Sequence, residues 1–171
     1  MNERKRIVLT GFMGAGKSTV ARCLAYILRA ENVDLDRFIE AREKRSAAEI
    51  IARDGEAEFR WLETLYLQRL LSEFDAPVIS LGGGAWVVER NREIIKQANC
   101  TSVWLETTFE HCWRNISFSR QDRPLARDKQ LAERLFYERR RFYCLADWHF
   151  AVRPDFTSFD VAKKIAEEVF G

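Results

Sequence analysis

A glycine-rich segment that ends in a lysine and a serine is the first part of the chain whose residues could do chemistry. It has the sequence GFMGAGKST over residues 11–19 and satisfies the pattern G-x-x-x-x-G-K-[ST] in full. The glycines allow a backbone that turns successive N–H groups toward a polyphosphate, and Lys17 would neutralise the β and γ oxygens. The Ser18 hydroxyl would ligate Mg²⁺. We therefore predict a nucleotide-phosphate site here; the alternative is an ordinary glycine turn.

Two carboxylates, Asp34 and Asp36, stand two residues apart at the end of the second apolar run. On a strand they would share one face, at the tip that points to the crevice where open α/β sheets bind ligands. One carboxylate could hold a magnesium-bound water, and the other could orient or deprotonate an attacking hydroxyl. The alternative is that both are solvated and that Asp36 caps the following helix.

A glycine triplet and a late cluster of arginines could bind an anionic acceptor. The triplet, residues 82–84, follows a buried run and offers either a backbone that a substrate can touch or a flexible turn. Residues 114–141 hold nine basic side chains against four acidic ones, and an arginine from a mobile loop at 120–125 could stabilise a transferring phosphoryl group. Arg60 and one arginine of 139–141 could make forked contacts to a carboxylate, although solvated helix faces explain most of these arginines.

The elements that must position these residues follow from the hydrophobic pattern. Short apolar runs alternate with longer segments at helical spacing, which indicates a parallel sheet with helices on both sides. We predict strands at residues 6–10, 32–35, 78–81, 101–105 and 148–152. We predict helices at residues 17–29, 36–54, 57–74, 89–97, 109–118, 129–145 and 159–170. No repeat or linker interrupts the 171 residues, so we expect one α/β domain over residues 1–171.

Composition excludes several classes of protein. With 47% hydrophobic and 32% charged residues the chain can bury a core, which excludes a disordered protein. Its 28 basic and 26 acidic residues are too balanced for a protein that coats nucleic acid. No apolar run approaches the roughly 18–20 residues that span a bilayer, and we see no signal peptide. We expect a cytoplasmic monomer that binds neither nucleic acid nor membrane, with free cysteines that lack zinc-ligand spacing.

In combination, these motifs resemble the shikimate kinase family, which has the nucleoside-monophosphate-kinase-like P-loop fold. The resembling stretches follow the family's order and read GFMGAGKSTVARCLA, VDLDRFIEAREKRSAAEIIARDGEAEFRWLE, VISLGGGA, DRPLA and ERRRFY. The resemblance implies a three-layer fold with a five-stranded parallel sheet in the order 2-3-1-4-5, flanked by helices. It implies substrate-side helices at about residues 36–74 and a lid at about residues 114–128. The implied reaction, a step of aromatic amino-acid biosynthesis, transfers the γ-phosphate of ATP, with Mg²⁺, to the 3-hydroxyl of shikimate.

The resemblance also implies a role for each matching residue. The residues that would bind ATP are Gly11, Gly14, Ala15, Gly16, Lys17, Ser18, Thr19, Arg120, Arg123 and Arg153. The residues that would bind shikimate are Asp36, Arg60, Gly82, Gly83, Gly84 and Arg139, with Glu63 holding Arg60 in place. The catalytic residues would be Lys17, Asp36 and Arg123, and the metal would be bound by Ser18 and Asp34.

Several positions depart from the family pattern and leave some assignments open. The stretch after Tyr143 is one residue short, so that either Arg139 or Arg140 could bind the acceptor carboxylate. Trp86, near the glycine triplet, and Ile51 leave open a related but altered acceptor. A kinase of the same fold that acts on gluconate or a nucleotide, and an inactive domain that regulates a partner, are the competing hypotheses. The charged residues that phosphoryl transfer needs are all present, which favours an active shikimate kinase.

Overall fold

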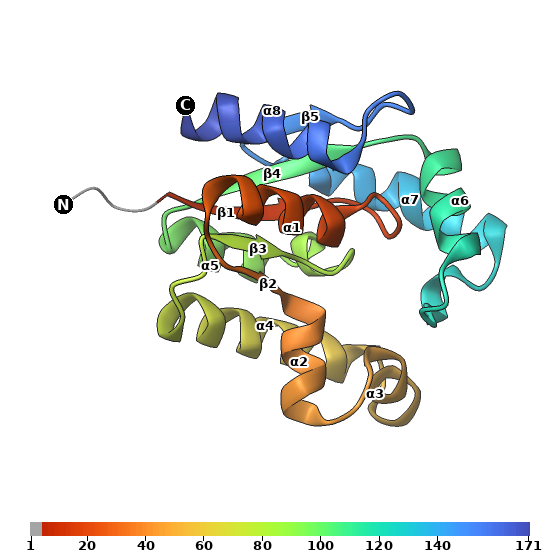
Figure 1. Ribbon diagram of the computed structural model, residues 1–171. Helices are drawn as coiled ribbons and strands as arrows, with labels where there is room; N and C mark the ends of the chain where they lie inside the picture. Colours follow the sequence, from red (N-terminus) through yellow and green to blue (C-terminus); the bar gives the residue numbers. More distant parts are fainter. Residues whose placement is uncertain (1–4) are drawn as a thin grey trace.

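Five parallel strands form the centre of the computed structural model, which describes residues 5–171 (Figure 1). The strands are β1 (Arg6–Thr10), β2 (Asn32–Asp34), β3 (Val78–Ser80), β4 (Cys100–Glu106) and β5 (Trp148–Ala151). Their order in the sheet is β2-β3-β1-β4-β5, and every neighbouring pair is parallel. The predicted sheet and its order are therefore confirmed. All five strands end at the same edge, which is the edge where ligands bind in folds of this kind.

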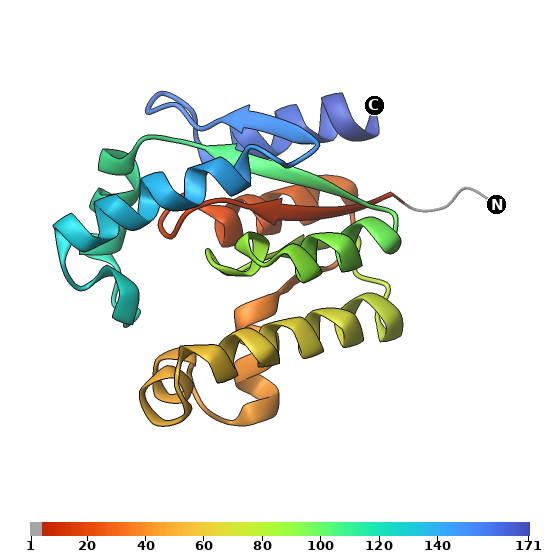
Figure 2. The ribbon, with the colours of Figure 1, turned by 180° about the vertical axis from the view of Figure 1, so that it is seen from behind.

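Helices cover both faces of the sheet. The alternation of side chains along β1 sends Ile7 and Leu9 to one face and Val8 to the other. Ile7 and Leu9 pack with helices α1 (Lys17–Leu28) and α8 (Ser158–Phe170). Val8 packs with the opposite layer, whose helices are α4 (Glu56–Glu73), α5 (Glu89–Gln97), α6 (Phe109–Phe118) and α7 (Lys129–Tyr143). The two views of the ribbon show these two layers on opposite sides of the sheet (Figures 1 and 2).

The segment predicted as one helix over residues 36–54 is two helices, and this prediction is wrong. Helix α2 (Leu35–Glu43) ends at Lys44, whose left-handed φ of 55° breaks the helical path. Helix α3 (Ala47–Asp54) then begins at Ser46 with a capping box, in which Ser46 and Glu49 satisfy each other's backbone N–H groups. Serine followed three residues later by glutamate is a helix-start signal that outweighs the continuous helical spacing.

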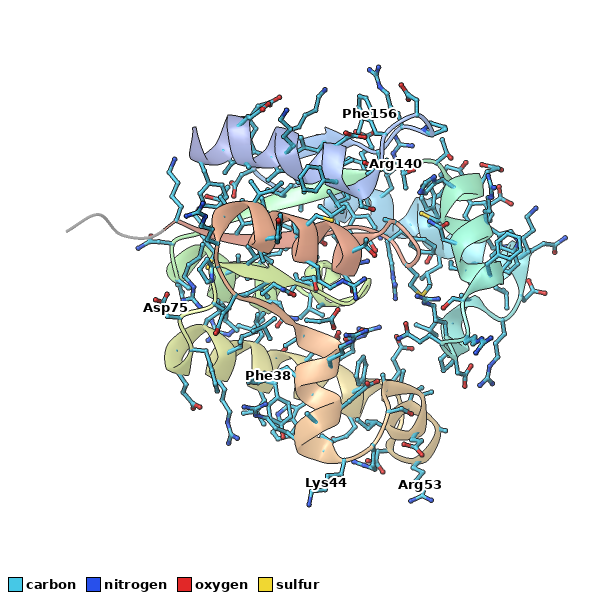
Figure 3. All side chains as sticks on the ribbon, in the orientation of Figure 1. Phe38, Lys44, Arg53, Asp75, Arg140 and Phe156 are labelled. Carbon is cyan, nitrogen blue, oxygen red and sulfur yellow. The ribbon has the colours of Figure 1, made fainter. Side chains whose placement is uncertain are left out.

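The other predicted elements agree with the structure to within one or two residues at each end. Two short 3-10 helices were not predicted: η1 (Ala85–Val87), after the glycine triplet, and η2 (Pro124–Ala126), in the expected lid. Helices α2 and α4 pack through aromatic rings, because the ring of Phe38, labelled in Figure 3, meets the ring of Tyr66 edge to face. No helix within residues 5–171 has the length and apolar character needed to cross a membrane.

Candidate active site

The glycine-rich segment connects β1 to α1 as a loop built for a phosphate chain. Gly11, Gly14 and Gly16 have φ angles of 148°, 78° and 93°, a range that favours glycine. A Cβ at Gly14 would also collide with the backbone carbonyl of Cys112 on α6. The loop leads into the N-terminus of α1, where the helix dipole favours an anion. The predicted phosphate site therefore has the backbone geometry that its sequence pattern requires.

The loop lines a large cleft at the carboxyl edge of the sheet. The cleft has a volume of about 1010 Å³. It is lined by the loop and start of α1, the end of β2 and α2, Ser46, residues 81–83, α6, the lid and the segment before α8. The predicted site residues among them are Gly14, Ala15, Gly16, Lys17, Ser18, Thr19, Asp34, Asp36, Gly82, Gly83 and Arg123. The structure thus brings the phosphate loop, both carboxylates, part of the triplet and the lid arginine to one cavity.

Ser18 and Asp34 offer adjoining oxygen ligands at the mouth of the phosphate loop. The Ser18 hydroxyl donates a hydrogen bond of 2.6 Å to Asp34 Oδ2, and Ser80 Oγ donates to the same oxygen at 3.2 Å. The other carboxylate oxygen caps α2 by accepting from the Arg37 N–H. Mg²⁺ prefers oxygen ligands and takes few from the protein when phosphates supply others. The pair fits Mg²⁺, although the described residues contain no cluster of three or more His, Cys, Asp or Glu side chains suited to a metal.

Burial shifts the titration of both charged groups at the centre of the cleft. It lowers the pKa of Lys17 to about 8, and the lysine Nζ donates to the carbonyls of Gly11 and Phe12 at 2.8 and 2.9 Å. Burial also raises the pKa of Asp36 to about 7, with the nearby Glu63 and Asp34 charges adding to the rise. The Asp36 Oδ1 atom is buried and has no hydrogen-bond partner. A desolvated carboxylate with a free oxygen is suited to accept a proton from a bound hydroxyl.

Arg60 lies on α4 and faces the glycine triplet. Its guanidinium pairs with Glu63, which is 0% exposed, and with Glu56 at 3.3 Å. The Glu63 partnership supports the predicted role of this glutamate in orienting the arginine. A Cβ at Gly84 would overlap the Arg60 guanidinium, so only glycine leaves the arginine its place. The second Glu63 oxygen is buried without a partner, and burial raises the pKa of this carboxyl.

Arg139, rather than Arg140, lies at the triplet on the side of α7. Arg139 is only 6% exposed, and its Nη1 would lie 3.2 Å from a Cβ at Gly83. Tyr143, one turn further along α7, donates a hydrogen bond of 2.5 Å to the Gly83 carbonyl. Arg140 is exposed and pairs with Glu106 at 3.0 Å (Figure 3). The two guanidinium groups of Arg60 and Arg139 thus lie against adjacent glycines.

The lid arginine Arg123 reaches the cleft, whereas three other predicted nucleotide ligands, Gly11, Arg120 and Arg153, do not line it. Arg123 donates to Gln121 at 3.2 Å, and its Nη1 is buried without a partner. Burial lowers the pKa of this guanidinium, and the Asp36 charge opposes that shift. Arg120 and Arg153 are exposed and do not line the cleft. Their proposed contacts with ATP stay predictions.

Several cleft residues were not predicted from the sequence. His111 and Asn115 line the cleft from α6, and Asn115 Nδ2 donates to the Gly14 carbonyl at 2.7 Å. Phe156 lines it from the segment before α8 (Figure 3). The Arg153 guanidinium carbon lies 5.8 Å from the centroid of the Phe156 ring. The only sequence signal for these residues was their position after predicted strands, because the carboxyl ends of the strands meet at the edge of the sheet where ligands bind.

Trp86 and Ile51, the two departures from the family pattern that suggested an altered acceptor, do not line the cleft. Trp86 is 4% exposed, and its indole N–H donates to the Phe142 carbonyl at 2.8 Å. Ile51 packs against the core from α3. Neither side chain lines the cleft, and neither do Arg60, Gly84 and Arg139.

Comparison with known proteins extends the resemblance over nearly the whole chain. The sequence model of the family described as Shikimate kinase matches residues 13–170. The shikimate kinase of Geobacter metallireducens is 39% identical over 166 residues, which cover 95% of this chain and 89% of that protein. A shikimate kinase from Acinetobacter baumannii, solved in complex with shikimate, superposes with a TM-score of 0.90 at 32% identity and covers 98% of this chain and 94% of that one.

A second solved structure agrees with the first. The shikimate kinase from Bacteroides thetaiotaomicron has a TM-score of 0.86 and 30% identity, covering 98% of this chain and 99% of that one. The family match spans almost all of the chain, and the relatives match in sequence and in fold over nearly their full lengths. The chain therefore belongs to the shikimate kinase family.

Proposed function

We propose that the protein transfers the γ-phosphate of ATP to the 3-hydroxyl of shikimate, giving ADP and shikimate 3-phosphate. The observation that carries this proposal is the position of Asp36. Its carboxylate lies against Gly82, where a Cβ would be 2.6 Å from Oδ1, and it shares the cleft with Lys17 of the phosphate loop. An acceptor held at the glycine triplet would therefore place a hydroxyl between the Asp36 carboxylate, which can accept its proton, and the phosphate loop.

On the donor side, the phosphate loop and Lys17 bind the nucleotide. The loop N–H groups and the start of α1 would hold the phosphate oxygens, and the Lys17 ammonium would follow the transferring group. Ser18 and Asp34 are the residues that would hold Mg²⁺, which when bound neutralises charge on the phosphates. Arg123 would add positive charge from the lid. Phosphoryl transfer depends mainly on such positioning and charge neutralisation.

On the acceptor side, Arg60 and Arg139 would bind the shikimate carboxylate and the glycine triplet would contact its ring. Asp36 would accept the proton of the 3-hydroxyl while that oxygen forms a bond to the γ-phosphorus. The bond between the γ-phosphorus and the bridging oxygen breaks at the same step, and its electron pair leaves with ADP. Guanidinium groups match the planar geometry of a carboxylate, which explains a pair of arginines at this position.

We further propose that residues 1–171 act as one catalytic domain, a cytoplasmic monomer, with a lid at about residues 114–128 and substrate-side helices at about residues 36–74. Closure of the lid would bring Arg123 onto the phosphates and exclude water, which would otherwise accept the phosphate. The buried, unpartnered Nη1 of Arg123 supports this assignment. The contacts of Arg120 and Arg153 with ATP belong to the same proposal.

A panel of acceptors tests the proposed function. We expect ADP release, measured in a coupled assay with Mg·ATP, to depend on shikimate and to stay at background with gluconate or AMP. The physical reason is that two guanidinium groups against a glycine triplet fit a carboxylate on a compact ring. Faster turnover with gluconate or AMP than with shikimate would refute the assignment of the acceptor, and background rates with all three would refute the kinase.

The Gly84→Ala substitution tests the arginine on α4. Gly84 has φ −98° and ψ −14°, which alanine adopts readily, so that the backbone is not strained. The added methyl group would displace the Arg60 guanidinium, and we expect the KM for shikimate to rise about 10- to 100-fold through loss of charge-assisted hydrogen bonds. The KM for ATP and the melting temperature serve as internal controls. An unchanged KM for shikimate would remove Arg60 from the acceptor site.

A further inference from the structure

A fully buried amide joins the two parts of the proposed carboxylate site. Asn91 lies on α5 and is 0% exposed. Its Oδ1 accepts a hydrogen bond of 2.7 Å from the Thr64 hydroxyl, and its Nδ2 donates one of 2.9 Å to the Ala85 carbonyl. Thr64 belongs to α4, whereas Ala85 directly follows the glycine triplet. A single side chain thus spans the gap between these two segments.

The two hydrogen-bond partners of Asn91 lie next to Arg60 and Gly84, whose separation would affect binding of the acceptor. Thr64 lies one turn beyond Arg60, and its hydroxyl is also 3.2 Å from the Arg60 carbonyl. Ala85 is bonded to Gly84, the residue against which the Arg60 guanidinium lies. A change in the distance between Thr64 and Ala85 would therefore move the arginine relative to the glycine. Neither Thr64 nor Asn91 lines the cleft.

The chemistry of the two partners fixes which atom of Asn91 faces which. The Ala85 carbonyl can only accept, so the Nδ2 group must face it, and Oδ1 is left to accept from Thr64. Aspartate would set a second oxygen against the carbonyl oxygen, and leucine would leave the Ala85 carbonyl without the amide that donates to it. Because an unpartnered buried polar group is costly, either substitution would push the two segments apart.

Other side chains also hold this segment in place. Tyr143 bonds the Gly83 carbonyl, and Arg92 bonds the carbonyls of Trp86 and Val87 at 2.7 and 2.8 Å. The Trp86 indole in turn bonds α7. These contacts tie the segment to α5 and to α7, which carries Arg139. Asn91 is the member of this set that reaches α4 and hence Arg60.

We propose that Asn91 is a positioning residue for the acceptor carboxylate, which it serves by holding Arg60 and Gly84 at a fixed separation. The proposal rests on the proposed function, since it assumes that the acceptor anion binds at this pair. Asn91 acts through Arg60 and does not contact the acceptor. Its loss therefore changes the affinity for the acceptor and leaves the nucleotide site as it is.

The test compares the steady-state constants of Asn91→Leu and Thr64→Val with those of the wild type. We expect the KM for shikimate to rise about tenfold in Asn91→Leu and by a smaller factor in Thr64→Val, while the KM for ATP changes less than about twofold. Thr64→Val keeps the side-chain volume and carries the test alone if Asn91→Leu does not fold. Ser102→Ala is the matched control, because Ser102 is buried on β4 and bonds Asp147 at 2.7 Å. We expect it to lower the melting temperature without changing the KM for shikimate.

A double-mutant cycle with Arg60→Ala separates positioning from general destabilisation. We expect Arg60→Ala to raise the KM for shikimate, and the Asn91→Leu change to add nothing in that background, because the two act through one contact. Additive effects, or an equal rise in the KM for ATP, would overturn the positioning role. If the wild type turns over shikimate but Asn91→Leu and Thr64→Val keep its KM, the positioning role alone falls. If the wild type does not turn over shikimate, the proposed function falls and the positioning role falls with it.

Discussion

The Asp36→Asn variant is expected to lose about 10²- to 10⁴-fold in kcat with shikimate, the range over which general bases act. Asparagine keeps the shape of the side chain and removes its capacity to accept the proton of the attacking hydroxyl. The carboxylate is suited to that task because burial raises its pKa to about 7 and Oδ1 is left without a partner. The measurement is single-turnover formation of shikimate 3-phosphate under saturating Mg·ATP, which separates chemistry from product release.

Two controls make the Asp36 result specific. Binding of ATP, followed by calorimetry, is expected to be nearly unchanged, since the phosphate loop is intact. Asp54→Asn is the matched substitution, because Asp54 lies at the end of α3 and pairs with Arg45 away from the cleft. We expect this variant to turn over as the wild type does. Turnover of Asp36→Asn within tenfold of wild type would remove the proposed base from the mechanism.

The Lys17→Met variant is expected to lower kcat by about 10²- to 10³-fold, the loss typical of removing one charged stabiliser of a transition state. Methionine retains most of the aliphatic length and removes the ammonium group that would follow the transferring phosphate. The pKa of about 8 keeps Lys17 mostly protonated at neutral pH, so that the wild-type side chain supplies a full charge. The measurement is again single-turnover chemistry, at ATP concentrations raised until the rate saturates.

The hydrogen bonds of Lys17 within the phosphate loop require a control for loop structure. Its Nζ bonds the Gly11 and Phe12 carbonyls, so Lys17→Met also loosens the loop. Lys17→Arg restores a cation but with a larger planar head, and we expect it to recover ATP binding more than kcat. Lys163→Met, on the exposed face of α8, is expected to behave as the wild type. A Lys17→Met enzyme that keeps its kcat and loses only affinity for ATP would assign Lys17 to ground-state binding.

Local patterns in the sequence were sufficient to locate the glycine-rich loop, which we propose binds the nucleotide. The glycines of residues 11–16 predict positive φ angles, and the structure has them at Gly11, Gly14 and Gly16. Asp34 and Asp36 were predicted to share one face at the end of a strand, which is wrong, because the strand ends at Asp34 and Asp36 lies in the first turn of α2. Both carboxylates nevertheless line the cleft. One local signal was missed, the capping box at Ser46 and Glu49 that divides the segment 36–54 into two helices. Each of these features depends on residues within a few positions of one another, which is why the sequence carries them.

The arrangement of residues proposed to bind the acceptor depends on contacts between residues far apart in the chain. The spacing near Tyr143 left Arg139 and Arg140 open, and the structure places Arg139 against Gly83 and Arg140 in a pair with Glu106, which favours Arg139. Trp86 shows the opposite case, a residue beside the triplet in sequence that packs away from the cleft. Proximity in the sequence therefore did not indicate which side chains lie against the glycine triplet.

By itself the sequence determined the alternation of strands and helices, the phosphate loop and the carboxylate of Asp34 at a strand end, since these follow from backbone preference and hydrophobic period. Only the tertiary structure decided which arginines meet the glycine triplet, how far burial shifts the pKa values of Asp36 and Lys17, and that Asn91 joins α4 to Ala85. The physical reason is that desolvation and hydrogen bonding at the site depend on which distant segments pack together, and the sheet order β2-β3-β1-β4-β5 sets that packing.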